Sequence, residues 1–493
     1  MVEVGGRAAE HIHPKIPAVR VEGSLGSWMI LSERWGSVVK VDLMIKGGSV
    51  WQEGQGFVDV DVAIHQGSVV AISAPDAEMP SAERTVDAHG LKVIPGLIDT
   101  HIHLRDPGFT YKEDYETGTR AAAAGGVTMV VDMPNTDPVP NTVERFRAHR
   151  ENAAAKSLVD FNHWAAPTRL DQIAPIAAEG AAGFKFFMIS HHYPYDNPDQ
   201  FISLSEPYRI YQTMSEIAET GRPCVVHPHN QDMWMSLVDL YEGSGRKTPE
   251  DREEAYRYAD DFIQTSAVAS LLFLAESTSC DLRVLHNNWV PLLRFVRAMK
   301  QAGYRATFEQ NPWAVFGFGV ADQVQNADEI WASLSDGTID VIASDHAPHS
   351  PQEVEQAHEN AFRSVIVSIT LEEHMLAMYL TEINGAGRIS LYRLVELLST
   401  NVAKHIGVYP KKGTIRVGSD ADITLIDMEK EDVIDATRLY SKCGTTPYEG
   451  WKLKGMPVAT LVRGRFVMED GQVIGEPGYG EFTPPIGFHQ GQV

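Results

Sequence analysis

Two histidines separated by one residue, His101 and His103, are the clearest chemical signal in this sequence. They lie in the string IDTHIHLRDPG, at the end of the apolar run KVIPGLID. Residues i and i+2 of a strand point to the same face, so both imidazoles can reach one metal ion. Metal ligands of barrel enzymes lie at the carboxyl ends of strands, which is where this run places them. The pair therefore predicts one part of a metal site.

The ends of later apolar runs carry more side chains that bind metals. They are Lys185 in GFKFFM, His227 in VVHPHN, His286 in RVLHNNW and Asp345 in IASDHAPH. In a barrel the carboxyl ends of all strands meet at one mouth, so these residues converge on the histidine pair. The second histidine of HPHN, His229, is the alternative to His227 as the ligand from that strand.

Lys185 needs its own explanation, because an unpaired ammonium in an apolar strand is costly. Burial near cations lowers the pKa of a lysine and frees its amine. A free amine can take up CO₂ to form a carbamate, whose two oxygens can bridge two metal ions. The alternative is a lysine that extends its ammonium out of the barrel mouth to water.

The elements that position these residues follow from the repeated pattern of the middle of the chain. Eight strand-like runs recur there, mostly separated by stretches of helical composition: KVIPGLIDTHIH, GVTMVVDMPN, LVDFNHWAAP, AAGFKFFMIS, RPCVVHPHN, DLRVLHNNW, YRATFEQNP and IDVIASDHAPH. Alternation of buried-type strands with helices is typical of a parallel sheet, and eight repeats indicate an α/β fold of the (β/α)₈ TIM barrel type.

Both ends of the barrel segment have a different texture, with short alternating strands and glycine turns that read as hairpins. We therefore expect a small β-sandwich domain built from both chain ends. The predicted organisation is an N-terminal arm (1–40), the sandwich (41–92 plus 405–475), a barrel (93–404) and a C-terminal tail (476–493).

Composition narrows the partners and the compartment. The chain has 493 residues and a formal net charge of −24, which disfavours nucleic acid and anionic membranes as partners. Its three cysteines are too few for a disulfide framework. Residues 1–20 lack the apolar core of a signal peptide, and no apolar run is long enough to span a membrane. We expect a cytoplasmic, soluble protein.

Three long strings resemble the cyclic amidohydrolases of the amidohydrolase superfamily, the group of dihydroorotase, allantoinase and hydantoinase (dihydropyrimidinase). They are IPGLIDTHIHLRDPG, YKEDYETGTRAAAAGGVTMVVDMPNTDPVP and ASDHAPHSP. The resemblance spans residues 40–470 and implies a barrel with a side β-sandwich. It implies two divalent, zinc-like ions bridged by hydroxide and held by His101, His103, carboxylated Lys185, His227, His286 and Asp345. Such centres polarise a carbonyl and supply hydroxide at neutral pH.

The closest motifs are those of dihydroorotase, which converts dihydroorotate to N-carbamoyl-aspartate. The resemblance implies that Arg105, Asn135 and His349 hold the free carboxylate of such a substrate, a role that suits the planar fork of arginine. Lys185 in GFKFFM is more similar to allantoinase or hydantoinase. Other departures from the family's motifs lie at the mouth of the barrel. They are HNNW after strand six, Glu309 and Pro312 followed by Trp313, and His229 where a glutamate is usual.

The substrate therefore stays open among cyclic ureides and imides, and the segment HHYPYDNPDQF and the stretch between His229 and Cys280 are candidate specificity loops. In the expected reaction Asp345 is the general acid–base that carries the proton from hydroxide to the leaving nitrogen. A non-catalytic scaffold relative is the alternative of a different class, although such relatives typically lose metal ligands. The ligand set suits Zn²⁺, and also Mn²⁺, Co²⁺ or Ni²⁺. The resemblance implies a homodimer or homotetramer.

Overall fold

The computed structural model describes residues 40–488, apart from 76, 190–201, 249, 252–253, 256–259, 318–326 and 360–367. The chain separates into two compact units, Met1–Ser37 and Val38–Val493, and every described residue belongs to the second. The expected N-terminal arm up to residue 39 and the segment HHYPYDNPDQF lie outside the described residues. Within the described part of the chain, no helix combines the length and apolar character needed to cross a membrane.

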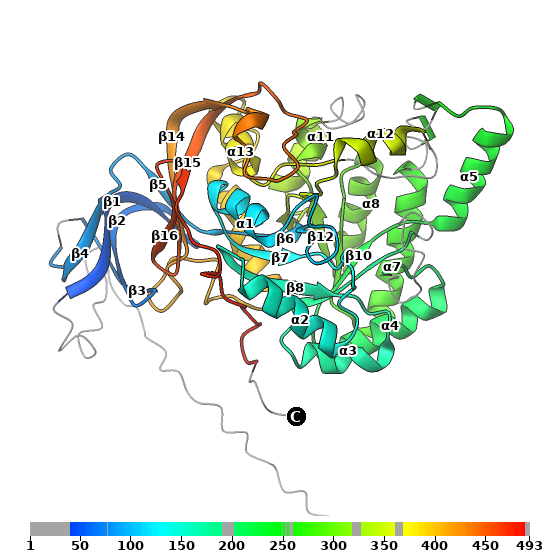
Figure 1. Cartoon of the computed structure of the whole chain (residues 1–493), viewed down its shortest axis with the longest axis horizontal. Coiled ribbons are helices and arrows are strands. Elements are labelled where there is room, and N and C mark those ends of the chain that lie inside the picture. Colours follow the sequence, from blue (N-terminus) through cyan, green and yellow to red (C-terminus); the bar gives the residue numbers. More distant parts are fainter. Residues whose placement is uncertain are drawn as a thin grey trace, which may run out of the picture. The chain divides into compact units, whose positions relative to one another are not determined.

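A curled, all-parallel sheet of eight strands occupies the middle of the chain (Figure 1). Its strands run in sequence order: β6 (Leu97–Ile102), β7 (Val127–Asp132), β8 (Asp160–Ala165), β9 (Gly183–Phe187), β10 (Cys224–His227), β11 (Leu282–Val284), β12 (Thr307–Gln310) and β13 (Val341–Ile342). These are the eight runs expected from the sequence. An isolated parallel bridge between Ile102 and His346 joins the first strand to the segment that follows the last.

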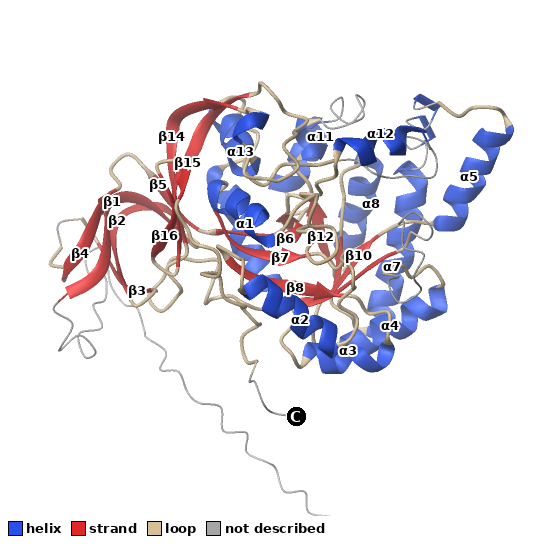
Figure 2. Ribbon diagram, in the orientation of Figure 1, coloured by secondary structure: helices blue, strands red, loops and turns tan. Residues whose placement is uncertain are grey.

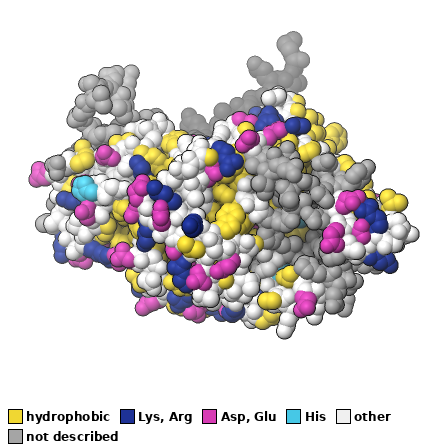
Figure 3. Space-filling model, turned by 90° about the horizontal axis from the view of Figure 1, so that it is seen from above, with side chains coloured by type: hydrophobic (Ala, Val, Ile, Leu, Met, Phe, Trp, Pro, Cys, Tyr) yellow, Lys and Arg dark blue, Asp and Glu magenta, His cyan; other side chains and the backbone are white. Residues whose placement is uncertain are grey.

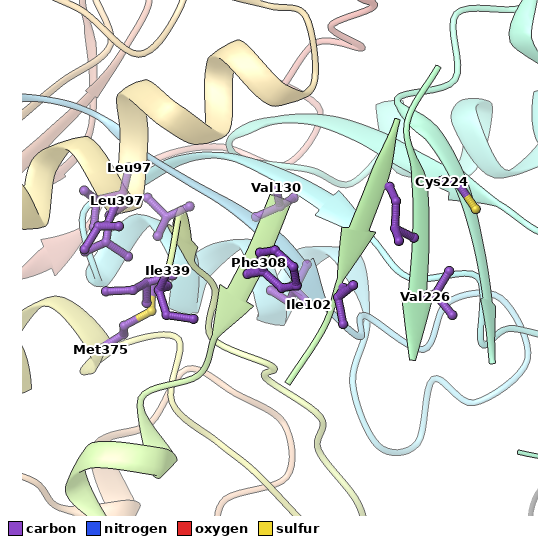
Figure 4. Close-up of a cluster of buried hydrophobic side chains, with 14 of the residues drawn as sticks. Leu97, Ile102, Val130, Cys224, Val226, Phe308, Ile339, Met375 and Leu397 are labelled. Atoms are coloured by element: carbon purple, nitrogen blue, oxygen red, sulfur yellow. The ribbon is translucent and has the colours of Figure 1, made fainter. Parts of the chain in front are cut away.

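The strands form here because their side chains are apolar on both faces. Every residue of β6, β7, β8 and β9 is buried, as expected when helices cover one face of a parallel sheet and side chains fill the other. Ile102, Val130, Val226 and Phe308 belong to one large core cluster, part of which is drawn in Figure 4.

Helices follow most of these strands and pack around the sheet (Figure 2). They are α1 (Tyr115–Ala124), α2 (Val143–Ala154), α3 (Leu170–Ala177), α4 (Pro207–Thr220), α5 (Gln231–Gly243), α7 (Thr265–Thr278), α8 (Val290–Gln301), α9 (Trp313–Phe316), α11 (Ala327–Ser335), α12 (Pro351–Glu359), α13 (Met375–Asn384), α14 (Leu391–Val395) and α15 (Asn401–His405), with shorter helical turns at Asp260–Gln264, Glu396–Thr400 and Ala436–Arg438. Helix α1 begins where the Asp114 carboxylate accepts a hydrogen bond from the Thr117 amide (2.9 Å), a capping box.

A second sheet contains strands from both ends of the chain, as the hairpin patterns predict. It comprises β1 (Lys40–Gln52), β2 (Gly56–His65), β3 (Ser68–Ser73), β4 (Ser81–Asp87), β5 (Lys92–Pro95), β14 (Ile423–Val433), β15 (Lys452–Val462), β16 (Arg465–Glu469) and β17 (Gln472–Val473). All nine strands are joined in one continuous hydrogen-bonded sheet. Residues of β1, β2, β14 and β15 share one hydrophobic core, so the two chain ends are packed together.

The C-terminal segment also packs on the eight-stranded sheet. The Phe161 amide of β8 donates to the Glu481 carbonyl (3.0 Å), and the Thr483 amide donates to the Phe161 carbonyl (2.9 Å). On the surface, acidic and basic side chains are interspersed over the face seen in Figure 3, so the net negative charge does not gather in one block there.

Candidate metal centre and substrate-binding residues

The strand ends bring five of the six expected metal ligands into a connected cluster. His101 is the penultimate residue of β6, and Asp345 follows β13. The Asp345 Oδ1 atom lies 3.1 Å from His101 Nε2 and 3.4 Å from His103 Nε2, and its Oδ2 atom lies 3.7 Å from His286 Nδ1. The His227 ring is centred 4.8 Å from the His286 ring. His101, His103 and Asp345 are close enough to share one ion.

His227 makes a ring contact with this cluster through His286. Its imidazole stacks 5.3 Å from the ring of Phe187, at the end of β9. His229 packs instead against Trp234 of α5, with the ring centroids 6.1 Å apart. The two histidines of HPHN therefore face different neighbours.

Lys185 is the sixth expected ligand, and it is fully buried on β9. Its Nζ atom lies 4.0 Å above the ring of Phe187 and has no hydrogen-bond partner among the described residues. Burial lowers the pKa of the Lys185 ammonium to about 7. A buried amine with a low pKa and no hydrogen-bond partner among the described residues can react with CO₂ to form a carbamate, whose oxygens bind metal ions. The surroundings of Lys185 are therefore compatible with a carbamate.

The backbone at the mouth is held in an uncommon conformation. Arg105, His286 and Asp345 all have left-handed φ angles, of 61°, 57° and 51°. Non-glycine residues adopt this region rarely, and they do so most often where a functional site over-determines the chain. This backbone conformation sets the direction of the three side chains, each of which lies just after the end of a strand.

A buried carboxylate orients His101, and it was not among the expected site residues. The His101 Nδ1–H group donates to Glu309 Oε1 at 2.6 Å, and Arg283 Nη2 donates to Glu309 Oε2 at 2.5 Å. Glu309 is on β12 and Arg283 is on the neighbouring strand β11. This contact places the proton of His101 on Nδ1 and leaves Nε2 available to bind a metal ion.

His286 is oriented in the same way by Asn311, whose Oδ1 atom lies 3.0 Å from His286 Nδ1. Asn311 in turn donates to Glu309 Oε1 at 3.1 Å, so both imidazoles share one buried network. The signal for these partners was present in the sequence, since DLRVLHNN and TFEQNP each place a charged residue inside an apolar strand.

The charges of the cluster favour a cation between the strand ends. Burial alone would lower the pKa of His101, but Glu309 and Asp345 outweigh it and raise that pKa to about 9. Burial would raise the pKa of Glu309, but His101 and Arg283 hold it at about 2. The same negative charges that attract a proton to His101 would attract a metal ion in its place.

Two of the three expected substrate-binding residues are in contact. The Arg105 Nη2 group donates to His349 Nε2 at 3.1 Å, and Arg105 is only 4% exposed. No carboxylate pairs with Arg105 among the described residues. Asn135 is buried in the turn after β7. Burial and the charge of Arg105 lower the pKa of His349 to about 4, so its ring is neutral.

Lys112 and Glu353 border this pair and were also not expected. Lys112 Nζ lies 3.3 Å from His349 Nδ1 and 2.7 Å from Glu353 Oε1. The Glu353 Oε2 atom of α12 lies 3.6 Å from His349 Nδ1. Two cations, Arg105 and Lys112, and the carboxylate of Glu353 therefore surround a neutral imidazole.

Comparison with known proteins agrees with this architecture. The chain belongs to the amidohydrolase family, whose family model matches residues 92–467. It is 32% identical to an allantoinase of Rubrobacter xylanophilus, over 90% of this chain and 98% of that protein. It is 33% identical to a dihydroorotase of a Geobacter species, over 87% of this chain and 100% of that protein.

A solved structure of the L-hydantoinase (dihydropyrimidinase) from Arthrobacter aurescens superimposes with a TM-score of 0.83 at 29% identity, covering 90% of this chain and all of that one. The chain is thus an enzyme of the cyclic amidohydrolase group, a hydrolase of C–N bonds in cyclic amides. The family is binuclear and metal-dependent, which the candidate ion-binding group His101/His103/Asp345 and the neighbouring imidazoles of His286 and His227 fit.

Proposed function

We propose that this enzyme opens a cyclic amide that carries a carboxylate, in the manner of a dihydroorotase that forms N-carbamoyl-aspartate from dihydroorotate. The observation that carries the proposal is Arg105, a buried arginine that donates a hydrogen bond to His349 and forms no ion pair with a carboxylate among the described residues. A buried guanidinium is costly without an anion, and its planar fork matches a carboxylate. Asn135 completes the proposed substrate-binding set.

We further propose two divalent ions, zinc in the first instance, held by His101, His103, His227, His286, Asp345 and a carbamate on Lys185. In the carbamate the neutral amine bonds to the carbon of CO₂ and loses one proton to water. When bound, such ions polarise the ring carbonyl and make a water nucleophilic at neutral pH.

Asp345 is the proposed general acid–base. Burial would raise its pKa, but the charges and hydrogen bonds of His101 and His103 hold that pKa well below the usual range. The carboxylate is therefore ionised at neutral pH and can accept the proton of the attacking water. It then delivers that proton to the ring nitrogen, which leaves as the C–N bond breaks.

A hydantoinase or allantoinase activity is the second candidate, acting on a related cyclic ureide or imide. It is favoured by the lysine on β9 within GFKFFM and by the close superposition on an L-hydantoinase. In that case Arg105 would hold a neutral ring through hydrogen bonds alone.

A substrate panel of dihydroorotate, hydantoin, dihydrouracil and allantoin tests the proposal, with Arg105→Met measured beside the unaltered enzyme. We expect kcat/KM to be highest for dihydroorotate, and we expect Arg105→Met to remove that preference. Turnover of dihydroorotate no better than that of dihydrouracil would refute the carboxylate site and leave the second candidate.

The finer architecture is also a proposal. The bridge between Ile102 and His346 supports closure of the eight strands into a (β/α)₈ TIM barrel. The shared core of β1, β2, β14 and β15 supports folding of the nine-stranded sheet into a β-sandwich, with the domain boundaries expected from the sequence. A homodimer or homotetramer in the cytoplasm remains our expectation.

A further inference from the structure

Hydrogen bonds to the residues before and after Arg105 hold the turn that carries it. Arg105 has a left-handed φ of 61° and sits between Leu104 and Asp106, both buried. Its own carbonyl accepts a hydrogen bond from the Phe109 amide at 2.9 Å. Because this conformation is unfavourable for an L side chain, contacts of the neighbouring residues must hold it.

On the first side, the Asp132 carboxylate at the mouth holds the Leu104 amide. The Leu104 amide donates to Asp132 Oδ1 at 2.8 Å, and Asp132 is the last residue of β7. The Tyr115 hydroxyl of α1 donates to the other oxygen, Asp132 Oδ2, also at 2.8 Å. Both partners are buried beside the strand ends, so they belong to the immediate frame of the site.

On the second side, side chains at the end of helix α2 hold the Asp106 carboxylate. The Asp106 carboxylate is 2% exposed and accepts from Asn152 Nδ2 at 2.9 Å and from Lys156 Nζ at 2.7 Å. Asn152 lies in the last turn of α2 and Lys156 two residues beyond its end. The Lys156 side chain is 37% exposed, so this contact reaches the protein surface.

Loss of these partners would act on Arg105 in two ways. The turn would lose the contacts that oppose its unfavourable backbone conformation. The Asp106 carboxylate, next in sequence to Arg105, would also be left buried without a counter-charge and would compete with a substrate carboxylate for the guanidinium. The side-chain hydrogen bonds of Asn152 and Lys156 go to Asp106 and not to a proposed metal ligand among the described residues.

We propose that Lys156 and Asn152 are positioning residues that set the preference for carboxylate-bearing rings by holding the Asp106 carboxylate away from Arg105. The inference rests on the proposed function, because it assigns Arg105 to the substrate carboxylate. It adds a surface lysine outside the mouth to the determinants of specificity.

The test compares Lys156→Met with the unaltered enzyme on dihydroorotate and dihydrouracil. We expect KM for dihydroorotate to rise roughly tenfold, the factor that corresponds to about 1.4 kcal/mol, with kcat nearly unchanged. We expect kcat/KM for dihydrouracil to stay the same, and Lys156→Arg to restore the low KM for dihydroorotate.

One further variant and one control separate a positioning role from a general loss of structure. Asn152→Ala removes one of the two partners of Asp106 and should raise the same KM by a smaller factor. Lys404→Met is the matched control, because Lys404 is also partly exposed and ion-paired, to Glu53 at 2.7 Å. It should change neither KM. Thermal unfolding and metal content are measured for each variant.

Arg105→Met, measured alongside, distinguishes the failure of this inference from the failure of the proposed function. If Arg105→Met raises KM for dihydroorotate and Lys156→Met does not, the inference is wrong and the carboxylate site stands. If Arg105→Met has no such effect, the proposed function fails and the inference fails with it. Equal losses on both rings, or a loss of bound metal in Lys156→Met, would also overturn the inference.

Discussion

Two buried lysines, Lys185 at the mouth and Lys412 at the junction of the two sheets, have opposite surroundings. Lys412 Nζ lies 2.5 Å from Asp422 Oδ2, 2.6 Å from Asp160 Oδ2 and 3.1 Å from Asp420 Oδ2. Burial would lower its pKa, but Asp422 and Asp420 outweigh burial and raise it. Lys185 has no such partner in the described chain, and burial lowers its pKa to about 7.

The three aspartates around Lys412 are also close enough to one another to hold an ion. The lysine ammonium already lies among them, so the chain supplies its own cation there. Asp160 begins β8 of the parallel sheet, while Asp422 precedes β14 of the mixed sheet, so the cluster links both sheets. Asp160 further accepts hydrogen bonds from Arg463 and from the amide of Glu481.

The difference shows what decides whether a buried lysine is structural or chemical. A lysine surrounded by carboxylates stays charged and stabilises the fold, since its removal would leave buried anions unpaired. A lysine among imidazoles and aromatic rings is neutral in part at neutral pH and free to react. The aspartates should differ in the same way: we expect Asp345 at the mouth to act in the chemistry and Asp422 at the junction to stabilise the fold.

The largest expected effect is on turnover by Asp345→Asn. The amide cannot accept the proton of the attacking water, so we expect kcat to fall about 10⁴-fold, while much of the metal stays bound. Stopped assays and elemental analysis of the purified variant measure the two quantities. Asp422→Asn is the counterpart at the junction and should keep turnover while lowering stability. Retained activity in Asp345→Asn would contradict the assigned role.

Replacing each lysine by methionine should affect stability at the junction much more than at the mouth. Lys412→Met removes the cation that pairs with Asp422 and Asp420 and leaves Asp160 paired with Arg463 alone, so we expect the free energy of unfolding to fall by about 3–5 kcal/mol with metal content unchanged. Lys185→Met preserves volume and removes an unpaired buried amine, so stability should change by less than about 1.5 kcal/mol. Urea unfolding measures both changes.

Lys185→Met should in addition lose bound metal and turnover. Because the proposed carbamate acts through its oxygens, Lys185→Ala supplied with acetate or propionate should regain part of both. If the lysine variants at the mouth bind metal as well as the unaltered enzyme does, Lys185 is not a ligand and the contrast with Lys412 would be one of neighbouring charges alone.

A smaller effect is expected when the buried carboxylate behind His101 is neutralised. Glu309→Gln keeps a hydrogen-bond acceptor for His101 but removes the charge, so metal affinity should fall about 10–100-fold. Titration with a chelator measures the affinity. Arg283 would then lose its buried ion-pair partner, so thermal unfolding of the variant is the control for damage to the fold.

The sequence was enough to predict the eight strands and the proximity of five of the proposed ligands, because buried parallel strands are continuous apolar runs and their ends share one edge. It was not enough for pairs that depend on strand register. Arg283 and Glu309 meet because β11 and β12 are neighbours. Asp160 meets Lys412 only after the two sheets pack together. The contact between Lys112 and Glu353 required the relative positions of a loop and of helix α12, which are far apart in the sequence.

Buried histidines at the mouth and elsewhere in the fold also differ in their surroundings. His101 at the mouth faces two carboxylates, whereas His149 of α2 is buried beside the Pro138 carbonyl, which its Nε2 atom approaches to 2.9 Å. Burial lowers the pKa of His149 to about 4, so this ring binds no proton in the folded state until the pH is well below its ordinary value of 6.5.

The smallest predicted effect is the pH dependence that follows from His149. Between pH 6.5 and pH 4 the unfolded chain takes up a proton at this residue and the folded chain does not, so stability falls as the pH falls. The loss is up to about 1.4 kcal/mol per pH unit over that window and absent above it. Urea unfolding at pH 7.5, 6.5 and 5.5 measures it. His149→Gln, which can still donate to the Pro138 carbonyl, should reduce the slope below pH 6.5. An unchanged slope would mean that His149 is protonated as easily in the folded protein as in the unfolded chain.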